Sequence, residues 1–125
     1  MIGYLIDSDC AVYAMTAQFE PLRMRLEQFE PGTIALSTIS LAEIFLGSKL
    51  GKPPPVEVVE EFLMQIPLLA FDEAAARAYA EMPFKRARFD RLLAAHALSI
   101  GAIVVTNNES DFADVPGLKV ENWTL

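Results

Sequence analysis

Short apolar runs that alternate with segments of helical spacing restrict the fold of this chain more than any other feature. Five runs predict strands, at residues 2–6, 33–37, 67–71, 102–105 and 118–120. Neighbouring parallel strands need a long crossover connection, and a helix between two strands supplies one. The alternation therefore predicts an α/β fold, an α/β/α sandwich in which helices cover both faces of a central parallel sheet.

Residues that start and stop helices mark the segments between these strands. Asp7 or Ser8 is placed to cap the first helix, and a Pro-Gly pair at 31–32 ends the second. Pro67 opens the third strand and favours an edge of the sheet or the first position of a strand, because proline cannot donate a hydrogen bond to a neighbouring strand. We predict helices through Ala17, from Pro21 to Phe29, around residues 41–45, over 56–66, from Asp72 through Met82, and from Asp90 through Ser99.

The composition fits a single domain over residues 1–125 and excludes several other classes of protein. Apolar residues make up 53% of the chain, with 8 Pro and 6 Gly, which excludes a disordered or collagen-like chain. A chain of this size buries about two-thirds of its surface, enough for one core. No apolar run approaches the ~20 residues that cross a bilayer, and the N-terminus lacks a signal-peptide pattern, so we expect no membrane segment.

Net charge and cysteine content narrow the expected partners and compartment. The formal net charge is −7, from 17 acidic and 10 basic side chains, which argues against a sequence-blind nucleic-acid binder. A nuclease remains compatible with this charge if metal ions and a local basic patch attract the substrate. The single cysteine, Cys10, cannot form an internal disulfide, which fits the reducing cytoplasm.

Four acidic residues stand at informative positions: Asp7, Glu43, Asp90 and Asp111. Asp7 ends the first predicted strand and Asp111 follows the fourth, at the edge where parallel strands form a binding crevice. Glu43 and Asp90 lie in helical segments that are otherwise apolar. Converging carboxylates repel one another unless a hard cation such as Mg²⁺ or Mn²⁺ joins them, and such an ion can generate hydroxide from water. Each acid could instead be a helix cap or strand-end residue, and spacing alone leaves both interpretations open.

Five motifs follow one another along the chain, at residues 5–9, 37–43, 89–98, 105–112 and 115–123. They read LIDSD, STISLAE, FDRLLAAHAL, VTNNESDF and VPGLKVENW. In this order they resemble the PIN-domain ribonucleases, specifically the VapC-type toxins of bacterial toxin–antitoxin pairs. The resemblance runs from end to end, and it implies an α/β/α sandwich with an acidic pocket that holds Mg²⁺ or Mn²⁺.

The resemblance also implies an activity, partners and residue roles. The expected activity is metal-dependent hydrolysis of RNA phosphodiester bonds, with tRNA or ribosomal RNA as substrate. The expected partners are a second copy of the chain and a small VapB-type antitoxin that blocks the pocket. Matched by position, Asp7 and Asp90 would hold the principal ion and Asp111 would complete its shell. Glu43 would support a second ion or orient the attacking water.

The chain departs from the family pattern at two places. The family usually has Asp-Thr-Asn after the first strand, where this chain has Asp7-Ser8-Asp9. Ser8 keeps the hydroxyl as a supporting group, and Asp9 replaces an amide by another negative charge. The stretch before Asp90 is shorter than in many relatives, which implies different access to the pocket. Thr106 and Asn107 match the residues that would fix the loop carrying Asp111.

Four of the ten basic residues lie close to Asp90 in the sequence: Lys85, Arg86, Arg88 and Arg91. We predict that they attract RNA phosphates beside the cutting site, the alternative being a solvated helix start or pairing with acids elsewhere. His96 lies six positions after Asp90, about 240° around a helix. We therefore interpret His96 as a structural residue and not as a general base.

Two other functions compete with the ribonuclease. One is a degenerate PIN domain that only binds its antitoxin, and the presence of all four acids argues against it. The other is a phosphatase of the haloacid-dehalogenase type, whose first two motifs are similar to residues 7–9 and 104–107. That fold needs a later lysine and a further acidic pair, and only 19 residues, with Lys119 alone, follow Thr106.

Overall fold

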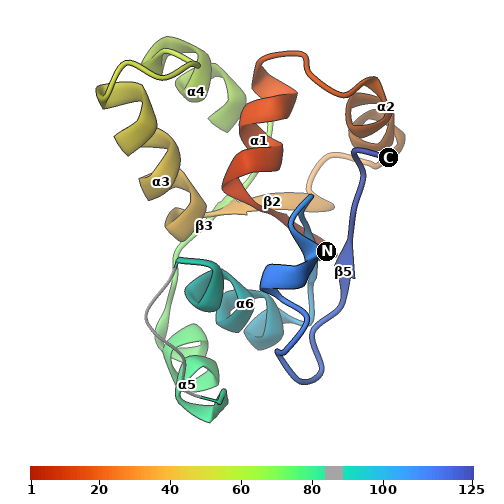
Figure 1. Ribbon diagram of the computed structural model, residues 1–125, viewed down its shortest axis with the longest axis vertical. Coiled ribbons are helices and arrows are strands. Elements are labelled where there is room, and N and C mark those ends of the chain that lie inside the picture. The colour runs from red at the N-terminus through yellow and green to blue at the C-terminus, as the bar shows by residue number, and fades with distance from the viewer. Residues whose placement is uncertain (84–88) are drawn as a thin grey trace.

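The structure is a computed structural model that describes residues 1–83 and 89–125 (Figure 1). Three residues predicted to bind phosphate, Lys85, Arg86 and Arg88, lie outside the described residues. Within the described ranges, five parallel strands form one sheet in the order β3-β2-β1-β4-β5. They are β1 (Tyr4–Ile6), β2 (Ile34–Ser37), β3 (Leu68–Leu69), β4 (Ile103–Val105) and β5 (Val120–Glu121).

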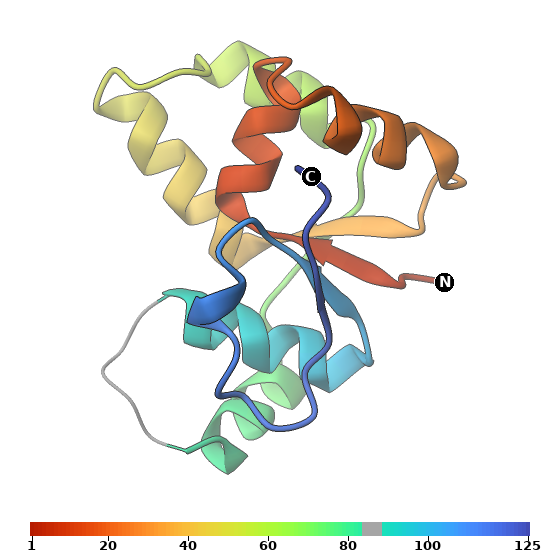
Figure 2. The ribbon, with the colours of Figure 1, turned by 45° about the vertical axis from the view of Figure 1, so that its right-hand side comes forward.

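Helices form a layer on each side of this sheet. The described part of the chain has α1 (Ser8–Met15), α2 (Glu20–Gln28), α3 (Thr38–Lys49), α4 (Val56–Leu63), α5 (Glu73–Glu81), α6 (Phe89–Ile100) and the 3-10 helix η1 (Glu109–Asp111). Figure 2 shows α1 to α4 on one side of the sheet and α5 and α6 on the other. The predicted α/β/α sandwich is thus confirmed. In the described ranges, every helix is too short or too polar to cross a bilayer.

The alternation of side chains along each strand builds two cores. Ile6 and Leu36 contribute to the core beneath α1 to α4, which also contains Leu41 of α3 and Val59 of α4. Neighbouring positions on the same strands, such as Leu5, point to the other face and pack against α6. Because both faces are covered, the strands are apolar throughout, which is why the sequence showed continuous runs.

The element boundaries differ from the predictions where the backbone leaves the helical or extended region. The first helix ends at Met15, two residues early, and Ala17 and Phe19 follow with left-handed φ angles of 57° and 58°. The third strand keeps only Leu68 and Leu69 and lies at the edge of the sheet, which is one of the two positions predicted from Pro67. The last strand begins at Val120.

An aromatic cluster covers the amino end of β1. We use this name for Tyr4, Phe29 and Trp123, whose ring centroids lie 5.0–5.4 Å apart, with Phe29 stacked on Trp123. The Arg25 guanidinium lies 4.9 Å from the Trp123 ring centroid and pairs with Glu121 at 3.2 Å. The Trp123 indole N–H donates to the same carboxylate at 2.9 Å. The segment that follows β5 is therefore fastened to the start of the first strand.

Candidate active site

Asp7 lies where β1 ends and α1 begins. It is buried, with 5% of its surface exposed, and its Oδ1 accepts the Cys10 backbone N–H at 2.8 Å as the cap of α1. The Thr106 hydroxyl also hydrogen-bonds to it. Burial nevertheless raises the pKa of Asp7 to about 6, because desolvation outweighs these two hydrogen bonds and Asp9 adds a like charge. Asp7 is thus both a helix cap and a buried carboxylate held at a cost in free energy.

Glu43 lies on α3, which follows the neighbouring strand β2. The Ser8 hydroxyl donates to its Oε1 at 3.1 Å and links the start of α1 to α3. Burial raises the pKa of Glu43, and the negative charges of Asp90, Asp9 and Asp7 raise it further. Three of the four predicted acids are therefore brought within electrostatic reach of one another. Asp9 is a fourth member of this acidic cluster, and the sequence indicated it only through its departure from the family pattern.

Asp111 lies on η1, the 3-10 helix that follows β4. It is exposed, and it is not among the charges that shift the pKa of Asp7 or Glu43. The loop before it is tied to α1, since Asn108 donates to Asp9 at 3.3 Å and Asn107 to the Tyr13 hydroxyl at 3.4 Å. Thr106 Oγ1 accepts the Asn108 backbone N–H at 3.0 Å. The participation of Asp111 stays a prediction.

The acidic cluster has the donor chemistry of a site for a hard divalent cation. Across residues 1–83 and 89–125, no group of three or more His, Cys, Asp and Glu side chains is arranged as a metal cage. Mg²⁺ does not need one, because it keeps several waters and binds through one or two carboxylates. The raised pKa values of Asp7 and Glu43 show carboxylates that a cation would stabilise in the charged form. The residues present therefore fit a hydrated ion.

A hollow of about 500 Å³ opens beside this cluster. Glu43 and Asp90 line it together with Lys52, whose exposed ammonium brings a positive charge to the acidic site. Apolar side chains, among them Leu50 and Phe89, form the rest of its wall. Sequence reasoning missed Lys52, because it lies 38 positions before Asp90 in a proline-rich loop with no motif around it.

Arg91 does not have the position that was predicted for it. It is 4% exposed, its Nη1 pairs with Asp114 at 3.1 Å, and its Nη2 donates to the Pro83 carbonyl at 2.7 Å. A buried guanidinium that already has these partners is not presented to a phosphate. We therefore correct the prediction that Arg91 binds RNA and assign Arg91 to the packing of α6.

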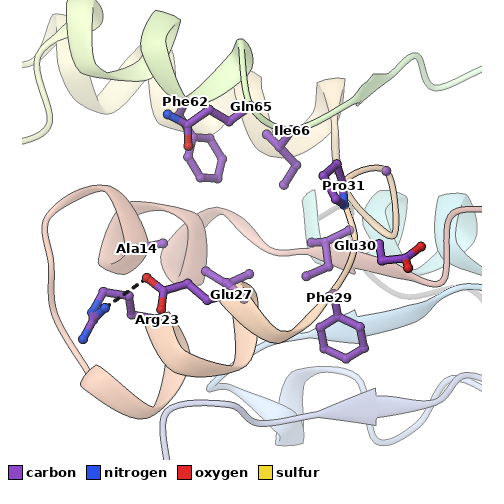
Figure 3. A pocket seen from close by; sticks show the side chains of 12 residues that line it. Ala14, Arg23, Glu27, Phe29, Glu30, Pro31, Phe62, Gln65 and Ile66 are labelled. Atoms are coloured by element: carbon purple, nitrogen blue, oxygen red, sulfur yellow. Dashed lines mark hydrogen bonds and ion pairs between the residues drawn. The ribbon is translucent and has the colours of Figure 1, made fainter.

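A second hollow, of about 320 Å³, lies between α2 and α4 and is separate from the acidic cluster (Figure 3). Apolar side chains such as Phe29, Phe62 and Ile66 line it, and Glu27 and Glu30 lie at its sides. Glu27 is engaged with Arg23 at 3.0 Å. None of the four predicted acids lines this hollow, so it is no part of the candidate active site.

Comparisons with known proteins agree with the fold and with the family that the motifs resemble. The sequence profile described as "PIN domain" matches residues 4–118. The chain is 29% identical over 133 residues to the tRNA(fMet)-specific endonuclease VapC of Shigella flexneri, covering 99% of this chain and 100% of that one. It is 27% identical over 132 residues to Ribonuclease VapC2 of Haemophilus influenzae, covering 98% and 99%.

Solved structures show the same architecture. VapBC2 from Rickettsia felis, bound to a DNA fragment from its promoter, superposes with a TM-score of 0.86 at 29% identity, covering 98% of this chain and 99% of that one. DNA-bound VapBC from Salmonella typhimurium superposes with a TM-score of 0.85 at 27% identity, again covering 98% and 99%.

Proposed function

The chain belongs to the PIN domain family, and on that premise we propose that it is a metal-dependent endoribonuclease, a VapC-type toxin inhibited by a cognate antitoxin. The observation that carries the proposal is the acidic cluster at the carboxyl ends of β1 and β2, where Asp7, Glu43 and Asp90 influence one another. The relatives are named as ribonucleases and a tRNA endonuclease, and the similar structures are toxin–antitoxin complexes.

Asp7 and Asp90 would hold the principal ion, with Asp111 completing its shell, and Mg²⁺ or Mn²⁺ is the ion that we propose. PIN-domain nucleases of this kind generally depend on a divalent metal. When bound, such an ion supplies a polarised water and offsets charge on the phosphodiester. Asp7 is fixed for this role from two sides, by the Cys10 N–H and by Thr106. Ser8, the residue after Asp7, donates a hydrogen bond to Glu43 and so links Glu43 to this strand end.

Glu43 is the residue that we assign to the attacking water. Its pKa is raised by burial and by neighbouring carboxylates, so it can accept a proton at a pH nearer neutrality than an exposed glutamate. Lys52 lines the same hollow and would attract the phosphate, as would Lys85, Arg86 and Arg88. Cys10 is no nucleophile, because it is buried and burial raises the pKa of its thiol.

The proposed partners are an RNA, an antitoxin and a second copy of the chain. We propose tRNA or ribosomal RNA as substrate, and one relative is named for tRNA(fMet). A homodimer is supported by three large apolar side chains exposed on α3 and at its C-cap, namely Phe45, Leu46 and Leu50, which are 38%, 59% and 68% exposed. An RNA substrate and a free, buried thiol are consistent with the cytoplasm, where the proposal places the protein.

Cleavage mapping on total RNA tests the proposal. The purified chain should cut RNA at defined positions with Mn²⁺ or Mg²⁺ and not with EDTA. Asp90→Asn should lower the rate about 100-fold or more, because several kcal/mol of transition-state stabilisation depend on the ion that it holds. Glu60→Gln, which removes one exposed charge on α4, is the matched control and should cut like the wild type.

Two outcomes would contradict the proposal. Wild-type cleavage by Asp90→Asn would remove that residue from the site. A chain that binds antitoxin but leaves every RNA intact would instead be the degenerate binding domain.

A further inference from the structure

A buried hydrogen bond between Ser37 and His96 joins two elements that carry acids of the active site. His96 Nδ1 lies 2.8 Å from Ser37 Oγ, and the two residues are 2% and 0% exposed. The mechanism described above uses neither side chain. A polar pair in this position has a desolvation cost, so it is retained only where both partners are satisfied.

The pair lies at a junction of the fold. Ser37 is the last residue of β2 and caps α3, where its Oγ accepts the Ile39 N–H at 3.0 Å. Glu43 follows six residues later on α3, and Asp90 precedes His96 by six residues on α6. The hydrogen bond therefore connects the base of the helix that carries Glu43 to the helix that carries Asp90.

The surroundings of His96 hold it in one orientation. The Phe71 ring packs edge-on against the His96 imidazole, with the two ring centroids 5.7 Å apart. The Phe71 backbone N–H in turn donates to Thr38 Oγ1 at 3.1 Å. Burial lowers the pKa of His96, while the nearby Asp72 carboxylate opposes the shift. The shift favours the neutral imidazole. When the Ser37 hydroxyl donates its proton to Nδ1, the imidazole proton lies on Nε2.

We propose that His96 is a positioning residue, which acts through Ser37 to fix the helix of Glu43 against the helix of Asp90. This inference rests on the proposed function, because it concerns the same acidic cluster. The two carboxylates influence each other electrostatically across these helices, so their separation sets how well they share a cation and a water. A displacement of about 1 Å in a catalytic group can cost ~100-fold in rate.

Two substitutions at position 96 separate the hydrogen bond from packing. His96→Leu fills the space without a hydrogen-bond acceptor, whereas His96→Asn keeps an acceptor near the Nδ1 position. We expect His96→Leu to lower kcat about 10- to 100-fold with little change in KM for RNA, and to weaken Mn²⁺ binding to the RNA-free protein about 10-fold. His96→Asn should recover most of both losses. Cleavage of a fluorogenic oligonucleotide and isothermal titration with Mn²⁺ measure the two effects.

The matched control is Thr16→Val. It removes one side-chain hydrogen bond, the one from the Thr16 hydroxyl to the Val12 carbonyl at 2.7 Å, and involves no residue of the junction between Ser37 and His96. It should leave kcat and Mn²⁺ affinity as in the wild type. If His96→Leu does not fold, Ser37→Ala removes the same bond from the other side, together with the cap of α3. Because the bond to His96 is then absent, adding His96→Asn to Ser37→Ala should cause no further loss of kcat or Mn²⁺ affinity.

The outcomes distinguish this inference from the proposed function. Folded His96→Leu that cuts RNA and binds Mn²⁺ like the wild type would overturn the positioning role. So would His96→Asn that is as impaired as His96→Leu. If the wild type cuts no RNA, the proposed function fails, while unequal Mn²⁺ affinities of the His96 variants would still support the coupling between the two helices.

Discussion

The two ends of β1 are built in opposite ways. At the amino end, Tyr4 belongs to an aromatic cluster in which every polar group that we describe has a partner: Arg25, Glu121 and the indole N–H of Trp123 satisfy one another. At the carboxyl end, three residues away, Asp7 is buried among like charges and its pKa is raised to about 6.

The contrast separates residues that stabilise the fold from residues that the fold must accommodate. An aromatic cluster of this kind contributes through buried area and ring packing. A carboxylate with a raised pKa lowers stability when it is ionised, so it persists for another reason. The acidic end is where we place catalysis, and the aromatic end should have no part in it. Substitutions at the two ends therefore test the division from both sides.

The largest effect is expected at the aromatic end. Trp123→Ala should lower the free energy of unfolding by about 3–5 kcal/mol, because it removes a large side chain that is only 2% exposed. Urea denaturation measures the loss, and Trp123→Phe should recover part of it. The rate of RNA cleavage per folded molecule should not change. A fall in that rate at constant folded fraction would contradict the assignment of catalysis to the acidic end alone.

A smaller effect of opposite sign is expected at the acidic end. The fold raises the pKa of Asp7 from 3.8 to about 6, so it favours the protonated form. This contribution to the stability of the folded state is fully present below pH 3.8 and is lost as the pH rises through 6. Above that pH, Asp7 is ionised in the folded state, and the desolvation of its charge lowers the free energy of unfolding. Asn cannot ionise and keeps an oxygen for the Cys10 N–H. Asp7→Asn should therefore stabilise the metal-free protein by on the order of 2–3 kcal/mol at pH 8.

Urea denaturation in EDTA at about pH 8 and about pH 3.5 checks this expectation. The gain should shrink toward zero at the lower pH, where wild-type Asp7 is protonated. Glu57→Gln, an exposed substitution on α4, should show no comparable gain. A destabilised Asp7→Asn at pH 8 would show that its two hydrogen bonds outweigh its burial.

The smallest effect sharpens the description of the aromatic end. Arg25→Ala removes the pair with Glu121 and the contact with the Trp123 ring, and should cost about 0.5–1 kcal/mol, since both charged side chains are partly exposed and screened. Thermal denaturation at low and high salt measures it, and the largely exposed pair of Arg77 with Glu73 provides the comparison. A loss of more than about 2 kcal/mol in the free energy of unfolding would mean that Arg25 stabilises the fold by more than these two surface contacts.

Local sequence signals predicted the features that depend on neighbouring residues. The apolar run that stops at Asp7 placed that residue at a strand end. Asp7 caps α1, and it is one of the two residues predicted as the cap. Asp72 caps α5 through the Ala75 N–H in the same way. Pro67 indicated an edge strand or a strand start, and β3 lies at the edge of the sheet. Each of these follows from backbone chemistry within a few positions.

Features that depend on distant partners were beyond the sequence. Arg91 looked like part of a basic segment, but its partner Asp114 lies 23 positions away. Ser37 and His96 are 59 positions apart, and only the strand order brings them together. Lys52 reaches the acidic site through the path of the loop after α3. In each case the tertiary packing decides, and no local spacing encodes it.

The pairing of arginines with carboxylates has a consequence for how RNA affinity depends on ionic strength. Arg23, Arg25, Arg77 and Arg91 all lie in ion pairs within the chain. At most six of the ten basic residues then remain to release counterions from an RNA strand. With a slope of about −0.7 per phosphate contact, the logarithm of affinity falls by no more than about 4 per tenfold rise in monovalent salt. The measured salt dependence of RNA binding would therefore count the phosphates that the basic side chains contact.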